Sequence, residues 1–166
     1  MRSSATGGGP QRLVQNAGQA AQHPAGTMTE VFGAQHRARD AAYDFFENPS
    51  VSAASIAEAH QRRTAERCVG QPFVFVPVDG SSLQFPDGKE QKGLGFIGSY
   101  KAGARGLKVL TAIAVSPDGV PLGVLGQAWW LRKGKVKSPH AQRDVKDKET
   151  RYWLQVPQQA QQVLAS

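Results

Sequence analysis

The sequence has a single cysteine, Cys68, and no long apolar run. One cysteine excludes an intrachain disulfide framework and any zinc site built from several cysteines, and we expect it to be a buried, unreactive thiol. No stretch approaches the roughly 20 apolar residues that a membrane span needs, and Met1–Pro10 lacks the apolar core of a signal peptide. These absences predict a soluble, cytoplasmic protein with no membrane partner.

Acidic residues and histidines are also few. The four histidines show no ligand spacing with one another or with Cys68, which argues against a metal site built from histidine. Twenty Lys and Arg residues outnumber thirteen Asp and Glu residues, so the formal charge is +7. A basic surplus of this size favours a polyanionic partner such as nucleic acid.

Helical patterns fill the first part of the chain. Residues 1–11 are mostly Ser, Gly and Pro, and we expect them to be disordered. The Asn48-Pro49 pair ends one helix, and Ser55 with Glu58 has the spacing of a capping box. The predicted helices are a marginal one at about Arg12–Gln22 without a docking partner, one at about Glu30–Glu47, and one from Ser50 or Ser52 to Cys68.

The pattern changes to strands at Pro72. Phe73–Val78 is apolar and β-branched, which predicts a buried strand that ends in a turn at Asp79–Ser82. Strands at about Leu107–Val115 and Val120–Ala128 are joined by Ser-Pro-Asp-Gly, a favourable hairpin turn. A polar helix from about Lys146 to Leu164, interrupted near Pro157, follows. We therefore predict an α+β fold in which the hairpin packs on the first strand, with the helices of residues 30–68 to one side.

Two further motifs have ordinary structural explanations. Gly93–Gly98 fits the letters of a dinucleotide fingerprint, but it neither follows a strand nor opens a helix, which favours a flexible connection. Trp129 and Trp130 could stack on bases, although adjacent aromatics at a strand end more often pack in the core or under a loop. Core packing is therefore the favoured interpretation.

Basic side chains concentrate between Arg132 and Lys148. Seven Lys and Arg residues lie there, against only Asp144 and Asp147. Such a segment can be a solvated loop or a loop that contacts phosphates, and the sequence leaves both open.

Asp79 is the most informative acidic residue. It ends an apolar run, where a carboxylate can meet an open edge of the sheet and take a catalytic or metal-binding role. Asp-Gly-Ser-Ser is also good turn sequence, and from the residues alone a turn is the stronger explanation.

The order of these features resembles bacterial cut-and-paste insertion-sequence transposases with an RNase H-like core of the aspartate-aspartate-glutamate class. The resemblance covers roughly residues 12–156. Its most specific parts are the Tyr-x-Phe-x-x-Asn-Pro-x-Val-Ser segment at 43–52 and the Asp-x-x-Ser-Leu strand end at 79–83. The other matching segments are Arg12-Leu13-Val14, Leu94-Gly95 with Ile97, Arg105-Gly106, Pro121–Leu125, Trp129-Trp130, and Lys148-Glu149 with Trp153-Leu154.

The resemblance implies a function and a site. In that family a helical N-terminal region contacts the transposon ends, and the first strand of a mixed sheet carries the first of three acids, which corresponds to Asp79. It would ligate metal in a two-metal, Mg²⁺-dependent reaction on DNA. The expected nucleic-acid contacts are Arg12, Lys101, Arg105, Lys108, Arg132, Lys133 and Lys135.

The chain also departs from the family pattern. No acid in a matching context corresponds to the second aspartate or the glutamate, among Asp87, Asp118, Asp144, Asp147 and Glu149. Asp44 and Glu47 stand where family members carry basic residues, Leu110 stands where many carry histidine, and a Gly-rich start replaces the first basic helix.

These departures lead us to expect a transposase fragment that binds DNA and is catalytically incomplete alone. Its expected domains are a disordered start (1–11), a helical DNA-binding-like region (12–70) and an incomplete, truncated RNase H-like core (71–166). It could dimerise or pair with a full-length transposase. The alternatives are a non-enzymatic DNA-binding or interaction module that regulates a full-length transposase, and a remnant without function.

Overall fold

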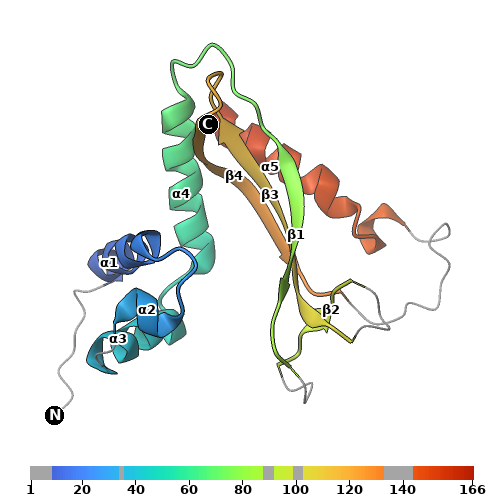
Figure 1. Ribbon diagram of the computed structural model, residues 1–166. Helices are drawn as coiled ribbons and strands as arrows, with labels where there is room; N and C mark the ends of the chain where they lie inside the picture. Colours follow the sequence, from blue (N-terminus) through green and yellow to red (C-terminus); the bar gives the residue numbers. More distant parts are fainter. Residues whose placement is uncertain (1–8, 34–35, 88–91, 99–102, 133–143) are drawn as a thin grey trace. The chain divides into compact units, whose positions relative to one another are not determined.

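The computed structural model describes residues 9–33, 36–87, 92–98, 103–132 and 144–166. The protein is α+β, with helices and an antiparallel sheet (Figure 1). It divides into two compact units, of which the first ends at Ser55 and the second begins at Ile56. None of the helices in these ranges has the length and apolar character needed to cross a bilayer. The division falls earlier than the predicted boundary at residue 70, so most of the third predicted helix belongs with the sheet.

Three helices form the first unit. They are α1 (Gly9–Gln22), α2 (Met28–Phe32) and α3 (His36–Glu47). Helix α1 begins three residues before the predicted start and contacts both other helices, so the expectation of an undocked helix was wrong. Disorder was expected for residues 1–11; it is wrong for residues 9–11, which form the first turn of α1, and residues 1–8 lie outside the described ranges. The buried side chains of this unit include Phe32, Ala42 and Phe45.

The predicted single helix at Glu30–Glu47 is two helices. Gly33 ends α2 with a φ of 79°, which is the left-handed region that glycine adopts without strain. Thr27 caps α2, since its hydroxyl accepts from the Glu30 N–H and the Glu30 carboxylate accepts from the Thr27 N–H. The capping box therefore lies at Thr27 and Glu30, where it fixes the start of a helix that the apolar pattern alone places too late.

Helix α4 (Ala53–Cys68) matches the third predicted helix. Its cap is Ser52, whose hydroxyl accepts from the Ser55 N–H at 3.2 Å, so Ser55 and Glu58 lie inside the helix. Cys68 at its end is half-buried, and burial raises the pKa of its thiol. The thiol is free, as a single cysteine requires.

The sheet is built around one central strand. Strand β3 (Arg105–Val115) pairs antiparallel with β1 (Val78–Gln84), β2 (Gly95–Phe96) and β4 (Pro121–Trp130). The β3–β4 hairpin confirms the prediction. Its turn places Gly119 at φ 82°, and the Ser116 N–H donates to the Val120 carbonyl at 2.9 Å. All described pairings are antiparallel.

Strand β1 differs from its prediction. It begins at Val78, where the predicted strand was to end, and runs through the Asp-Gly-Ser-Ser segment assigned to a turn. The apolar run before it makes one isolated bridge, between Phe75 and Val115, and both Phe73 and Phe75 are exposed. Pairing with the long strand β3 supplies seven consecutive partners, which outweighs the local turn propensity. Asp79 therefore lies inside a strand.

Helix α5 (Arg151–Ala165) covers one face of the sheet, after a short 3₁₀ turn, η3 (Val145–Asp147). The core of this unit comprises Leu110, Ala112, Ala114, Leu125, Ala128, Val156 and Ala160. The helix continues through Pro157 instead of breaking there, because Val156 and Ala160 on either side are anchored in the core. We had predicted the helices of residues 30–68 beside the core strands, and of these α4 does contact the sheet, at β4. The packing of α5 on the sheet was not predicted.

Alternate residues of the strands face opposite sides. On β1, Val78 lines a pocket together with α5 residues, and a Cβ at Gly80 would lie 3.7 Å from the Trp153 ring of α5. The even-numbered positions of β1 and β3 therefore face α5, and Asp79 and its odd-numbered neighbours face the opposite side.

Candidate functional site

Asp79 stands at one end of a polar row that crosses three strands. It is exposed and lies opposite Thr111 of β3, which in turn lies opposite Gln127 of β4. The Gln127 Nε2 donates to Thr111 Oγ1 at 3.1 Å, and the Trp129 Nε1 donates to Gln127 Oε1 at 2.9 Å. The hydrogen bonds fix the amide orientation of Gln127 and the ring of Trp129 on the sheet face opposite α5.

The metal site implied by the resemblance does not fit the residues around Asp79. Within the described ranges, no group of three or more His, Cys, Asp and Glu side chains is placed to hold a metal ion. Two hard divalent cations need several carboxylate ligands, and a single aspartate cannot supply them. These residues therefore do not form a two-metal Mg²⁺ site, and we derive no metal-dependent reaction step from them.

Three of the predicted nucleic-acid contacts gather at one end of the sheet. Arg105 and Lys108 lie at the start of β3, and Arg132 follows the end of β4. The Lys108 Nζ donates to Ser82 Oγ at 2.8 Å, and the Arg105 guanidinium lies 4.2 Å from the centre of the Phe96 ring. We call Arg105, Lys108 and Arg132 the basic end of the sheet.

An ion pair reduces the net charge of the basic end. Arg132 binds Glu149 through two bonds, from Nε to Oε1 at 2.6 Å and from Nη2 to Oε2 at 2.7 Å. This fork-to-fork contact lowers the pKa of Glu149 and raises that of Arg132, and the nearby charge of Lys108 lowers the pKa of Glu149 further. The positive charge of Arg132 is therefore already partly neutralised by the Glu149 carboxylate when no DNA is bound.

The two adjacent tryptophans have different surroundings. Trp130 stacks on Tyr152 of α5 with ring centroids 4.2 Å apart and packs against the core, as predicted. Trp129 points to the opposite face and is half exposed. Of these two tryptophans, Trp129 is therefore the one whose exposed ring a base could reach.

The remaining predicted contacts lie elsewhere. Arg12 is an exposed residue of α1 in the first unit, and Lys101, Lys133 and Lys135 fall outside the described residues, as does most of the basic loop. The Gly93–Gly98 segment contains β2, which pairs with β3, so its glycines serve a sheet and not a strand–turn–helix phosphate loop. Gly95 also allows the backbone of Arg132 to approach β2 closely, because a Cβ there would lie 2.6 Å from the Arg132 backbone.

Sequence reasoning missed the partners of these residues. Thr111, Gln127, Ser82 and Glu149 become neighbours of Asp79, Lys108 and Arg132 only through the strand register and the docking of α5. The alternation of Thr111 with apolar neighbours in β3 was the one available signal. No family model matches this chain, and no curated protein matches it.

Proposed function

We propose that this chain is the Asp79-bearing part of a DNA transposase with an RNase H-like core, and that it binds DNA. The observation that carries the proposal is the position of Asp79, exposed on the first strand of the sheet. The resemblance assigns the first catalytic acid to that strand. The strand is followed by an antiparallel hairpin and a helix, β3, β4 and α5.

The charge distribution supports DNA binding. The chain carries a formal +7, and Arg105, Lys108 and Arg132 gather at the basic end of the sheet. Neutralising phosphates with Lys and Arg releases counterions, which makes such binding strongly dependent on salt. Trp129, half exposed on the sheet face opposite α5, adds a ring on which a base can stack.

Catalysis in this proposal needs further carboxylates. Asp79 supplies one acid, whereas the resemblance implies three, so cutting would depend on acids contributed by another polypeptide. We therefore expect the isolated chain to bind DNA without nicking it.

A second candidate function is regulation of a complete transposase by a non-enzymatic module. The observation that favours it is the outer edge of β1, which pairs with no other strand in the described part of the chain. Such an edge can engage another polypeptide. Inhibition of a complete enzyme by the added chain, without nicking by the chain itself, would distinguish this candidate.

The test combines nicking and binding. A supercoiled plasmid is incubated with the chain and Mg²⁺, and binding of a labelled duplex is followed over a range of salt concentrations, for the wild type, Asp79→Ala and the surface control Asp118→Ala. We expect no nicking by any of the three and salt-sensitive binding by all. Nicking that Asp79→Ala alone abolishes would show that the chain is catalytically complete, and the absence of binding even at low salt would overturn the proposal.

A further inference from the structure

Within the described part of the chain, the outer edge of β1 has no paired strand. Phe75 exchanges two hydrogen bonds with Val115, the Pro77 carbonyl accepts from Ile113, and the Phe85 N–H donates to Arg105, all toward β3. Backbone groups of a strand alternate in direction, so the even-numbered residues direct theirs away from β3. These residues are Val78, Gly80, Ser82 and Gln84.

The two edges of the sheet, at β4 and at β1, differ in how their backbone groups are covered. On β4, side chains of α4 cover the backbone: the Val124 N–H donates to His60 Nε2 at 3.1 Å, and the Leu122 carbonyl accepts from Arg67 Nη1 at 3.0 Å. On β1, the outward residues are uncharged, and Gly80 has no side chain at all. Natural sheets protect exposed edges with charges, prolines, bulges or covering elements. Along Val78–Gln84, β1 carries one charge, Asp79, and its register with β3 has no bulge. Its outward residues Val78, Gly80, Ser82 and Gln84 include neither a charge nor a proline.

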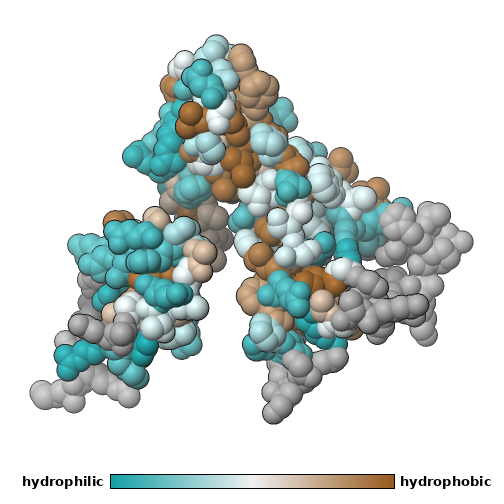
Figure 2. Space-filling model, viewed as in Figure 1, coloured by the Kyte–Doolittle hydropathy of each residue, from teal (hydrophilic) through white to brown (hydrophobic). Residues whose placement is uncertain are grey.

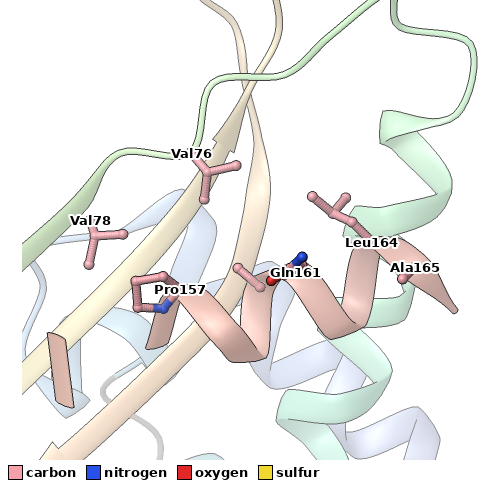
Figure 3. A pocket seen from close by; sticks show the side chains of 7 residues that line it. Val76, Val78, Pro157, Gln161, Leu164 and Ala165 are labelled. Atoms are coloured by element: carbon pink, nitrogen blue, oxygen red, sulfur yellow. The ribbon is translucent and has the colours of Figure 1, made fainter. Parts of the chain in front are cut away.

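Beside this edge lies an apolar pocket of about 360 Å³. Figure 3 shows Val76 and Val78 on one side of it and Pro157, Leu164 and Ala165 of α5 on the other. Trp153, Pro157, Ala160 and Leu164 follow the i, i+4, i+7, i+11 spacing of one helix stripe. Trp153 and Leu164 of this stripe are exposed, so α5 carries more apolar surface than the sheet covers. Hydrophobic side chains are visible on the surface of the second unit (Figure 2).

We propose that the occupant of this edge is a second copy of the chain, with the two β1 strands paired antiparallel about a two-fold axis at Ser81. Ser81 is the centre of β1, so this register pairs the whole strand, with Val78 opposite the partner's Gln84 and Gly80 opposite the partner's Ser82.

The charges of β1 suit this register. Asp79 is the strand's only charged residue, and it meets the partner's Leu83 instead of its own symmetry mate, so no like charges face each other. A two-fold axis perpendicular to the sheet keeps both α5 helices on one face. The apolar stripe of each copy then continues across the joined sheet, and the pocket at Val76 and Val78 is closed by the partner's strand instead of by water.

The first experiment measures the mass of the full chain in solution by light scattering at tens of micromolar. We expect a dimer for the wild type. Ser82→Pro should give a monomer, because it removes an outward N–H that β3 does not use, while Ser82→Ala keeps that N–H and should remain dimeric. Leu164→Lys should also give a monomer, and Val120→Lys, which charges an exposed residue of the β3–β4 turn, should not.

Circular dichroism of each variant confirms that the sheet is retained. A monomeric wild type would overturn the proposal, and so would a dimer that survives both Ser82→Pro and Leu164→Lys in folded form. Binding of an unrelated strand-forming peptide to a monomeric chain would assign the edge to another partner and would also overturn it.

The second experiment tests the register in a Cys68→Ala background. Ser81→Cys places two thiols directly opposite each other in a non-hydrogen-bonded pair, with Cα atoms about 4.5 Å apart, which suits a disulfide. Leu83→Cys is the matched control, since its symmetry mate would lie four residues away, about 13 Å. Rapid oxidation to a covalent dimer is expected for Ser81→Cys alone. Equal oxidation of both variants, or of neither in a dimeric sample, would exclude this register.

Discussion

The imidazole of His60 on α4 accepts a hydrogen bond from the backbone N–H of Val124 on β4, with Nε2 and N separated by 3.1 Å. Thr64, one turn later, is fully buried against Gly123, and Arg67 donates to the Leu122 carbonyl. The spacing of 60, 64 and 67 places the three side chains on one face of α4. Three side chains thus fix three consecutive residues of β4.

Gly123 is the most sensitive point of this contact. Its φ is 144°, and an added Cβ would overlap Thr64 Oγ1. We expect Gly123→Ala to lower the free energy of unfolding by about 2–4 kcal/mol, through backbone strain and overpacking together. Urea denaturation measures the change. Gly70→Ala is the control, because its φ is 82° with open space around it, so it reports strain alone. Equal losses in both variants would show that α4 does not press on Gly123.

Loss of Glu149 should destabilise the fold in a pH-dependent way. The folded-state pKa of Glu149 lies below its ordinary value, so its stabilising effect is present above about pH 4.5 and disappears as the pH falls through the lowered pKa. Both side chains of the ion pair are more than a third exposed, and solvent screening limits the effect of Glu149→Gln at neutral pH to about 0.5–1 kcal/mol. Thermal denaturation should show a larger difference from the wild type at pH 7 than at pH 3, because part of the stabilising effect is lost once the pH falls below 4.5. A difference that persists unchanged at pH 3 would contradict this assignment.

Lys108 should contribute to DNA affinity through a phosphate contact. It lies at the basic end of the sheet, where its Nζ donates to the hydroxyl of Ser82 and its charge acts on Glu149. We expect Lys108→Ala to reduce the slope of log K against log salt concentration by about 1, equally for different DNA sequences. Fluorescence anisotropy gives the slope. Arg62→Ala on the exposed surface of α4 is the charge-matched control. If Arg62→Ala reduced the slope as much as Lys108→Ala does, Lys108 would have no specific role in DNA binding.

Cys68 should react slowly with alkylating agents in the folded protein. Burial raises the pKa of its thiol, which lowers the fraction of the nucleophilic thiolate at neutral pH. Iodoacetamide modification followed by mass spectrometry should accelerate several-fold when urea unfolds the chain. A rate equal in the folded and unfolded protein would mean that the end of α4 is open.

The hairpin could be predicted from sequence because its determinants are local. Ser116–Gly119 is turn sequence, and the flanking residues are β-branched or apolar, so both strands were placed within a few residues. The same local reasoning misplaced β1, because the apolar, β-branched run Phe73–Val78 has a higher strand propensity than the polar residues that follow it. Only pairing with β3 makes a strand of Asp79–Gln84.

The candidate site was predictable one side chain at a time but not as an arrangement. Asp79, Lys108 and Arg132 were identified by residue type, yet the neutralising partner of Arg132 lies 17 residues further along the chain, at Glu149. Ion pairing across such a separation depends on how α5 docks, which no periodic pattern encodes. The break at Gly33 was missed for a simpler reason, because the apolar residues on both sides fit one continuous helical face.

The central position of β3 also orders the steps by which the sheet assembles. Its contacts with β4 close across the five residues 116–120, whereas its contacts with β1 must close the much longer segment of residues 85–104. Loop closure slows as the loop lengthens, so we expect the hairpin to form early and β1 to join a preformed template late. In native-state hydrogen exchange of the monomeric Ser82→Pro variant, the amides shared by β3 and β4 should then be the slowest to exchange, and those between β1 and β3 should open first.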